Sequence, residues 1–479
     1  MKYYVIAILI LIVAFILLFQ IKTLPETWQQ FSDNVDSDFK GYNILEKLCL
    51  DIGGRIAGTE KGKESEKFIT DQLRSFGYDD INLHPFEHIT WERDKCTLNI
   101  YDSAGNVIST IEALSLGLTP TSTNIKFPLI DLYSGTQDDY ALYPKDSLRN
   151  KIVLVDKKSP IGHYIVHRVD KVRLAQKMGV RGIIIFNQLY GEVISIGTAA
   201  FENKSEIPAV TITRENGLYI KELLQKKVQL YAGLNISNKE YNTISNNIIV
   251  DIQGKEKPQE YVLLTAHFDA WDVGQGAVDN GADVAVILEI ARQFKKLNIQ
   301  PLRTIRFIFF NAEEFGLVGS KRYIQDHKEL LNQIVYAVNL EMNILPNGIN
   351  LLFDDRDRAW FEALSENLSA LGMQKKVIAS PWLESDQCYF MLQGVPTITF
   401  SEKTDIFAQH KYHSSGDNIE LIDPDDLKKC VKVVGLVIKE IANNPEFEPW
   451  RLSQQEITQK IKNSDLEKLL KLRNIKIDL

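Results

Sequence analysis

Acidic and imidazole side chains follow two strongly apolar segments in the second half of the chain. His267 and Asp269 end the segment EYVLLTAHFD, and Asp279 comes twelve residues after the histidine. Glu313 and Glu314 end the segment TIRFIFFNAEE. Carboxylates that lie close together repel one another unless a cation sits between them. These residue types and their spacing indicate a metal site, at which a metal ion would activate water for hydrolysis.

Residues of the same types lie at the ends of later segments. Glu341 follows YAVNL, Asp386 lies in LESDQCYF before GVPTITF, and His413 lies in KYHSSGDN after it. His410, three residues earlier, is the alternative to His413 as a ligand. For Asp386, a site role and a solvated loop acid are both open. Convergence of so many acids and imidazoles is what a site with two metal ions requires.

Structural interpretations of the same residues stay open beside this one. Glu313 and Glu314 are also typical of an acidic pair at a helix N-terminus, where the helix dipole favours negative charge. Asp279 is also typical of an N-cap for the helix that follows it, and such a cap is compatible with metal binding.

Apolar segments that alternate with helices position these residues. The helix expected over residues 281–297 has one apolar face, made of Val284, Ile287, Leu288, Ala291 and Phe294. The intervening strands are apolar throughout, so they are buried on both faces. This pattern predicts an α/β fold with a mostly parallel central sheet and helices on both faces. Sites in such sheets lie beyond the carboxyl ends of the strands, where the candidate residues fall.

A β-rich segment separates the beginning of the chain from this α/β part. Its sequences LRNKIVLVD, KVRLAQKMGVRGIIIFN and IPAVTITRENG resemble the protease-associated (PA) domain. His163 and His167 are spaced to share a helix face there. We expect surface histidines there rather than metal ligands.

The N-terminus contains an uninterrupted apolar run from Tyr3 to Phe19, with Lys2 before it and Lys22 after it. The run is longer than a typical signal-peptide core, and no small-residue cleavage site follows. We therefore expect a single-pass transmembrane anchor that leaves the rest of the chain outside the cytoplasm. Cleavage and secretion are the alternative.

Composition excludes some partners. The 479 residues include 55 Lys plus Arg and 63 Asp plus Glu, a net charge of −8, which argues against nucleic-acid binding. Hydrophobic residues make up 44% and charged residues 25%, as in globular proteins with a large core. Cys49, Cys96, Cys388 and Cys430 form no CxxC pair, and both disulfides and free thiols stay open. The oligomeric state is open as well, a homodimer included.

In order and spacing, the candidate residues resemble those of the co-catalytic dizinc exopeptidases. This family includes bacterial leucyl-type aminopeptidases, glutamate carboxypeptidase and carboxypeptidase Q, and AHFDAWDVGQGAVDN is most similar to the carboxypeptidase Q branch. The resemblance implies the zinc exopeptidase fold and two Zn²⁺ per chain. It implies that His267 and Glu341 bind one ion, Glu314 and His413 bind the other, and Asp279 bridges both.

The resemblance also implies two catalytic roles. Asp269 would orient His267, and Glu313 would act as general base for a hydroxide that bridges the ions. The chain departs from the family at two positions. Glu341 stands where the family usually has aspartate, and Asp283 stands where smaller residues are usual, so Asp283 is expected to narrow the substrate space.

With this resemblance, the chain divides into segments with different expected roles. They are a signal-anchor at 1–22, the N-terminal part of the peptidase domain at 23–115, an inserted PA-like domain at 116–233, the zinc peptidase domain at 234–445 and a polar helical tail at 446–479.

The expected function is that of a dizinc metallo-exopeptidase acting on short peptides, as an aminopeptidase or dipeptidase. A carboxypeptidase of the glutamate carboxypeptidase type is an alternative, in which an arginine would hold the substrate carboxylate. Arg322, Arg356 and Arg358 are available for that role. Two further alternatives on this scaffold are a single-zinc acyltransferase similar to glutaminyl cyclase and an inactive receptor-like homologue.

Overall fold

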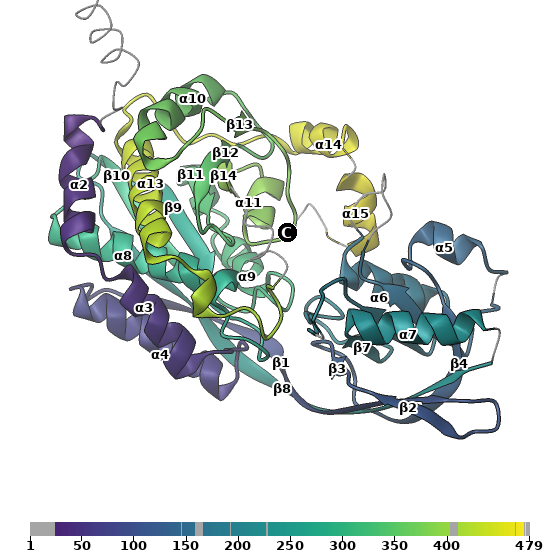
Figure 1. Ribbon diagram of the computed structural model, residues 1–479. Helices are drawn as coiled ribbons and strands as arrows, with labels where there is room; N and C mark the ends of the chain where they lie inside the picture. The colour runs from purple at the N-terminus through teal and green to yellow at the C-terminus, as the bar shows by residue number, and fades with distance from the viewer. Residues whose placement is uncertain are drawn as a thin grey trace, which may run out of the picture.

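The structure, a computed structural model, describes residues 24–144, 146–158, 166–191, 193–226, 229–402, 411–464, 466–473 and 475. The expected anchor, His163 and His410 lie outside the described residues. Over the part that is described, no helix has both the length and the apolar character needed to cross a bilayer. The chain folds into two lobes (Figure 1).

Parallel strands form the middle of the sheet in the large lobe. They are β9 (Lys257–His267), β10 (Arg303–Phe310), β11 (Ile334–Asn339) and β14 (Thr397–Glu402). Antiparallel strands border them, β8 (Tyr231–Ile252) beside β10 and β12 (Pro346–Asn350) beside β14; the short β13 (Val377–Ile378) pairs with β12. The expected α/β fold is confirmed, and four of the six pairings among these strands are parallel; the antiparallel pairings are those of β8 with β10 and of β12 with β14. β8 is antiparallel to its neighbour β10 because the chain enters it from the other lobe and not through a helical crossover.

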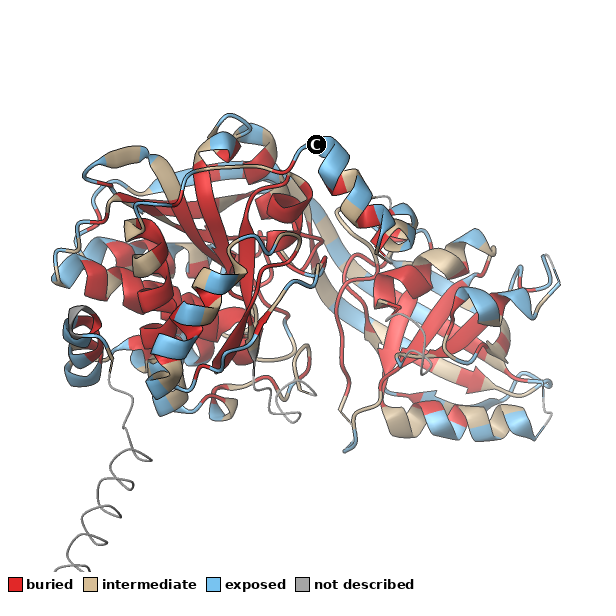
Figure 2. Cartoon of the chain, turned by 90° about the horizontal axis from the view of Figure 1, so that it is seen from above, coloured by how far each residue is buried: buried red, intermediate tan, exposed pale blue. Residues whose placement is uncertain are grey.

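Helices cover both faces of this sheet, because side chains of successive strand residues point to opposite faces. Val262 and Leu264 of β9 face one core, and Leu263 faces the other. Figure 2 shows the strands between these cores as almost entirely buried. The helices on the first face are α2 (Glu26–Ser37), α3 (Gly41–Lys47), α4 (Glu60–Ser75), α8 (Ala282–Lys296), α10 (Arg358–Asn367) and α13 (Pro424–Asn443). Those on the second are α9 (Val318–Asp326), α11 (Gln387–Leu392), α14 (Gln454–Lys462) and α15 (Leu466–Arg473).

The small lobe contains the expected strands and, in addition to the one helix that was expected, the helices α5 (Gln137–Ala141) and α7 (Arg214–Gln225). Its parallel strands are β4 (Ser122–Asp131), β5 (Ile152–Asp156), β6 (Gly182–Phe186) and β7 (Ala209–Ile212). Its other elements are β2 (Val107–Ile111), β3 (Leu114–Ser115) and α6 (Arg168–Lys177). Leu98, Ile100 and Ile111 pack into its core, so the unit includes residues before position 116.

A long two-stranded ribbon joins the lobes. β1 (Asn82–Tyr101) pairs with β8 along its whole length, from Asn82 opposite Ile249 in the large lobe to Tyr101 opposite Tyr231 in the small lobe. β10 runs antiparallel to β8, and its last residues pair near position 248. The carboxyl ends of the parallel strands therefore face the small lobe.

Candidate metal centre

The structure brings together all seven candidate residues at the carboxyl edge of the sheet. His267 ends β9, and Asp279 lies in the turn that leads into α8. The others come from loops that follow β10, β11 and β14: Glu313, Glu314, Glu341 and His413, with Asp269 just after β9.

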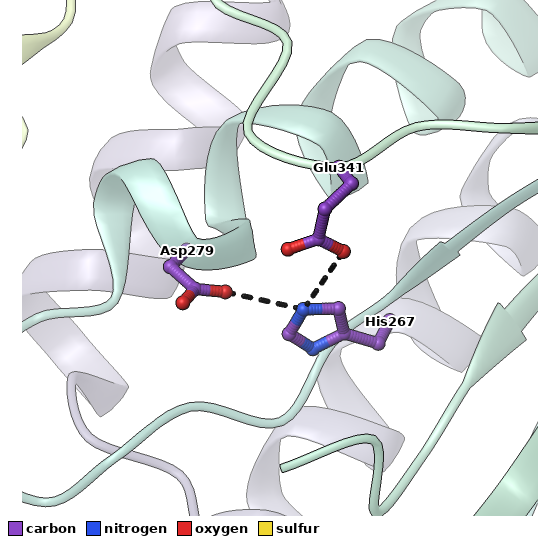
Figure 3. Close-up of side chains that lie close together, drawn as sticks. All are labelled: His267, Asp279 and Glu341. Atoms are coloured by element: carbon purple, nitrogen blue, oxygen red, sulfur yellow. Dashed lines mark ion pairs between the residues drawn. The ribbon is translucent and has the colours of Figure 1, made fainter. Parts of the chain in front are cut away.

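His267, Asp279 and Glu341 form one group of possible ligands (Figure 3). Nε2 of His267 lies 3.2 Å from Oδ1 of Asp279 and 3.4 Å from Oε2 of Glu341. The histidine is completely buried. A one-methylene longer glutamate at 341 thus reaches the position where the family usually has aspartate.

Asp279, Glu314 and His413 form a second group. Nε2 of His413 lies 2.9 Å from Oδ2 of Asp279 and 3.1 Å from Oε1 of Glu314. The two oxygens of Asp279 thus face different histidines, so the aspartate belongs to both groups. This is the arrangement that one carboxylate shared by two cations requires.

The donor atoms fit zinc. Nε2 of His267 and Oε1 of Glu314 are buried, and neither makes a hydrogen bond with any described residue despite its close neighbours. These two atoms lie close to other possible ligand atoms without forming hydrogen bonds to them. This is the arrangement expected when the atoms face a common metal position. Each group offers imidazole nitrogen and carboxylate oxygen, the ligands that zinc takes in catalytic sites, and three ligands leave a position open.

Asp269 contacts both parts of the centre without belonging to either ligand group. Its carboxylate accepts hydrogen bonds from the backbone N–H groups of Glu313 and Glu314, at 3.1 and 3.2 Å. One of its oxygens lies 3.4 Å from Nδ1 of His267. Asp269 therefore fixes the position of the His267 ring relative to the backbone of Glu313 and Glu314.

Residues that the sequence had not singled out support the ligands. Asp417 accepts hydrogen bonds from the backbone N–H groups of residues 277–279, at 2.9, 2.7 and 3.2 Å. Ser385 donates to Oε2 of Glu341 at 2.6 Å, and Trp271 donates to Oε2 of Glu314 at 2.5 Å. All three lie inside the sequence motifs quoted above. Their closeness in sequence to the candidate ligands was the one feature from which a supporting role could have been predicted.

Arg55 supports the centre from a distant part of the sequence. It is completely buried, and its guanidinium donates to the backbone oxygens of Phe268, Gln275 and Gly276, at 2.5, 2.8 and 2.8 Å. It thereby ties the residues after β9 to the turn that carries Asp279. The sequence GGRIAGT contained no sign of this contact.

The structure overturns the expectation for Asp283 and decides between the two alternatives for Asp386. Asp283 accepts a hydrogen bond from the backbone N–H of Asn343 at 3.0 Å and is buried, so it fastens a loop instead of narrowing the substrate space. Asp386 is completely buried, which excludes a solvated loop acid. Burial, together with the charge of the nearby Glu341, raises the pKa of Asp386 to about 7, although His267 acts in the opposite direction.

The charges of the cluster shift its titrating groups. Burial raises the pKa of Glu313 well above its usual range, and the neighbouring Glu341 and Glu314 act in the same direction. Burial lowers the pKa of His413, but Glu314 and Asp279 outweigh it and raise the value to about 9. This concentration of negative charge is what divalent cations would neutralise.

Comparison with known proteins agrees with this geometry. Residues 247–438 match the family model of peptidase family M28, and residues 125–220 match that of the PA domain. Residues 247–438 are thus similar to peptidase family M28, and the small lobe is similar to the PA domain. The resemblance seen in the sequence is confirmed, and these matches support a metallopeptidase.

The curated relatives of the chain carry two kinds of name. Carboxypeptidase Q of Bos taurus is 24% identical over 422 residues, which cover 86% of this chain and 87% of the relative. Aminopeptidase YwaD of Bacillus subtilis is 28% identical over 444 residues, covering 89% and 88%.

Solved structures share the fold of this chain. An M28 peptidase precursor from Shewanella amazonensis superposes with a TM-score of 0.76 at 24% identity, covering 89% of this chain and 98% of that one. BSAP, a zinc aminopeptidase from Bacillus subtilis, gives a TM-score of 0.64 at 25% identity, covering 85% and 95%.

The small lobe, which matches the PA domain and is called the PA lobe below, contacts the loop that carries His413. The backbone N–H of Ile196 donates to the carbonyl oxygen of His413 at 2.8 Å, and Ser195 forms a β-bridge with Ser414. Arg168 is the first residue of α6, and its guanidinium lies against Gly197. It occupies the space that a Cβ at position 197 would take. Its Nε donates to the carbonyl oxygen of Thr198 at 3.1 Å.

Arg168 is a buried cation without a carboxylate partner among the described residues. Only 7% of the residue is exposed, and no described carboxylate oxygen lies within ion-pair distance of it. Burial lowers its pKa, while Tyr412, Glu314 and Asp279 act in the opposite direction, as charges of the nearby centre would. A buried guanidinium is costly unless an anion accompanies it.

None of the three arginines considered from the sequence is, like Arg168, described as a buried cation without a carboxylate partner beside the candidate metal centre. Arg356 pairs with Asp354, and Arg358 pairs with Asp355. Arg322 lines a separate cavity of about 630 Å³ between the ribbon and α9. In the PA lobe, His167 caps α6 and is half-buried, so the expectation of a surface histidine is wrong there.

Proposed function

We propose that this protein is a dizinc exopeptidase of the M28 kind that hydrolyses dipeptides and short peptides at a free end. The observation that carries the proposal is the pair of three-residue groups that share Asp279. His267 and Glu341 would hold one ion with it, and Glu314 and His413 the other. Zinc, when bound, lowers the pKa of water and polarises the carbonyl of the scissile bond.

Glu313 is proposed as the general base. Its backbone is fixed by Asp269, its neighbour Glu314 supplies a ligand atom, and its own carboxylate is in neither ligand group. A raised pKa suits a group that must accept a proton from the attacking water and then release it to the leaving amine. Asp269 acts as a positioning residue for both glutamates and for His267.

Arg168 supports a dipeptide as the preferred substrate. Arginine recognises carboxylates through paired hydrogen bonds, and a dipeptide presents its free carboxylate one residue beyond the scissile bond. The chain's relatives are named as aminopeptidases and as carboxypeptidases, and a dipeptide has the free end that each requires. A longer substrate held by its C-terminus would make the same contact, which is the carboxypeptidase alternative.

The decisive experiment compares Glu313→Gln with the matched variant Glu314→Gln. We expect Glu313→Gln to lower kcat for a dipeptide by roughly 10²- to 10⁴-fold, because it removes the proton acceptor. Two zinc ions per chain, measured by elemental mass spectrometry, should remain bound. Glu314→Gln should lose one of them.

Each result has a clear opposite. Turnover retained in Glu313→Gln would refute the assigned base. A single zinc per chain in the unaltered protein would refute the dizinc site and favour the acyltransferase alternative, and no hydrolysis of any peptide with full zinc would favour the receptor-like one.

The substrate proposal is tested with Arg168→Gln. We expect its KM for a dipeptide to rise by about tenfold, as for a lost charge-assisted hydrogen bond, while its KM for an aminoacyl fluorophore without a carboxylate is unchanged. Equal effects on both substrates would show that Arg168 does not bind the carboxylate.

We further propose that residues 3–19 anchor the enzyme in a membrane with its active site outside the cytoplasm. The support is the apolar run itself, near the minimum length for a bilayer span. Retention in the membrane pellet after an alkaline wash would support an anchor. An intact mature protein that starts after residue 22 would show cleavage instead.

A further inference from the structure

The C-terminal tail joins the two lobes on the side away from the ribbon. Leu466 and Leu470 of α15 pack into the core of the large lobe, whereas the same helix touches α6 of the PA lobe. Figure 1 shows α15 beside α6 at one edge of the molecule and the β1–β8 ribbon at the opposite edge. The polar composition of the tail gave no indication of this position.

Arg473, the last residue of α15, contacts both lobes with one guanidinium. Its Nη2 lies 3.2 Å from Oδ2 of Asp170 in α6, and its Nη1 lies 2.9 Å from Oε1 of Glu384 in the large lobe. Arg473 is 3% exposed and Asp170 is completely buried. Arg173 adds a second link by donating to the carbonyl oxygen of Leu472 at 3.0 Å.

Both carboxylates lie next to residues of the proposed active site. Asp170 accepts a hydrogen bond from the backbone N–H of His167 at 3.2 Å, which fixes the first turn of α6, where Arg168 lies. Glu384 precedes Ser385, whose hydroxyl donates to Glu341. Of the two carboxylates that Arg473 contacts, Asp170 is two residues after Arg168 in the sequence. Glu384 immediately precedes Ser385, which contacts the proposed ligand Glu341.

We propose that Arg473 is a positioning residue that sets the distance between Arg168 and the metal centre; the proposal rests on the proposed function. A two-stranded ribbon alone resists twisting and bending weakly, since isolated pairs of strands are marginally stable. A buried ion pair at the other edge restrains that motion, and removing its cation leaves Asp170 buried without compensation. The tail therefore holds the PA lobe at the distance that a dipeptide must span.

The test compares Arg473→Gln with Lys471→Gln in the zinc-loaded full chain. Lys471 lies on the same helix, is exposed and pairs only within it, with Glu467. We expect Arg473→Gln to raise KM for a dipeptide by about tenfold, because displaced binding groups lose their alignment. KM and kcat for an aminoacyl fluorophore, which does not reach Arg168, should stay unchanged. Lys471→Gln should change neither substrate, and Arg473→Lys should restore part of the dipeptide KM.

A second measurement needs no substrate. Hydrogen exchange of the amides of α6 should become faster in Arg473→Gln and stay unchanged in Lys471→Gln. Unchanged exchange of α6, or an equal change in KM for both substrates, would overturn the positioning role. If the unaltered enzyme hydrolyses neither substrate, the proposed function fails, and the exchange of α6 decides by itself whether Arg473 positions the PA lobe.

Discussion

Asp417 illustrates at the residue scale how the centre depends on groups that are not ligands. Its carboxylate accepts three backbone hydrogen bonds from the turn that carries Asp279. Burial raises its pKa to about 7, against the lowering effect of those hydrogen bonds. A carboxylate held in this way fixes the turn that carries Asp279, the proposed shared ligand, as supporting groups do in other metal sites.

We predict that Asp417→Asn weakens zinc binding by roughly 10- to 100-fold, the usual effect of losing such a support. The amide keeps the volume of the side chain but offers only one acceptor oxygen for three N–H groups. Competition with a fluorescent chelator measures the affinity. Asp425→Asn, an exposed change nearby, is the control, and an unchanged affinity in Asp417→Asn would contradict the supporting role.

Lys157 leads to a prediction about pH. Its Nζ donates to the hydroxyl of Ser195 at 2.7 Å, and burial lowers its pKa from 10.5 to about 7. The unfolded chain therefore binds more protons than the folded chain between these values, and this residue makes stability rise with pH across that window. We expect Lys157→Met to raise the melting temperature more at pH 6 than at pH 9, measured by scanning calorimetry. An equal shift at both values would contradict the lowered pKa.

At the element scale, helix α13 connects the loop of the centre to the core. Asp423 is its N-cap and accepts hydrogen bonds from the backbone N–H groups of Asp425 and Asp426, at 2.8 and 3.1 Å, with Pro424 at the first helical position. The helix then buries an apolar face against β9 and β10. It begins shortly after Asp417, so its start determines where the loop of the centre ends.

Asp423→Ala should lower the free energy of unfolding by about 1 kcal/mol, the usual cost of losing an aspartate cap. Urea denaturation followed by circular dichroism measures it. Asp425→Ala removes a first-turn acid that interacts only with the helix dipole and Lys428, so its cost should be a few tenths of a kcal/mol. Equal losses in the two variants would show that the cap is not the main contribution.

At the scale of the whole molecule, the centre lies where three connections meet: the sheet edge, the PA lobe and the tail. The proposed ligands come from separate loops of the large lobe, and the PA lobe contacts the His413 loop directly. Metal ions bound there would join these loops and stabilise the folded state, because the unfolded chain does not hold the ligands together.

Removing metal should therefore lower the melting temperature. Zinc at about 100 times its Kd stabilises a fold by about 2.7 kcal/mol, so a chelator should produce a shift of several degrees that added zinc reverses. Glu313→Gln should show the same shift, since Glu313 is not a ligand, and Glu314→Gln should show a smaller one. A melting temperature that does not respond to the chelator would contradict the ligand assignment.

The sequence by itself determined the α/β class, the metal ligands as candidates and the PA insertion. These features depend on local patterns: apolar strands that end in polar residues, helical periodicity and motifs of a few residues. The antiparallel borders of the sheet were not predictable in this way, because pairing direction depends on how the chain returns.

Only the tertiary structure decided which distant residues complete the centre. Arg55 supports a turn 221 residues away, and Arg473 joins a helix 303 residues away. Such contacts have no local pattern, since a buried arginine looks like any surface arginine until its partners are known. The physical reason is that burial of a charge is set by the packing of whole lobes, whereas the tendency of a segment to form a strand or helix is set by its own residues.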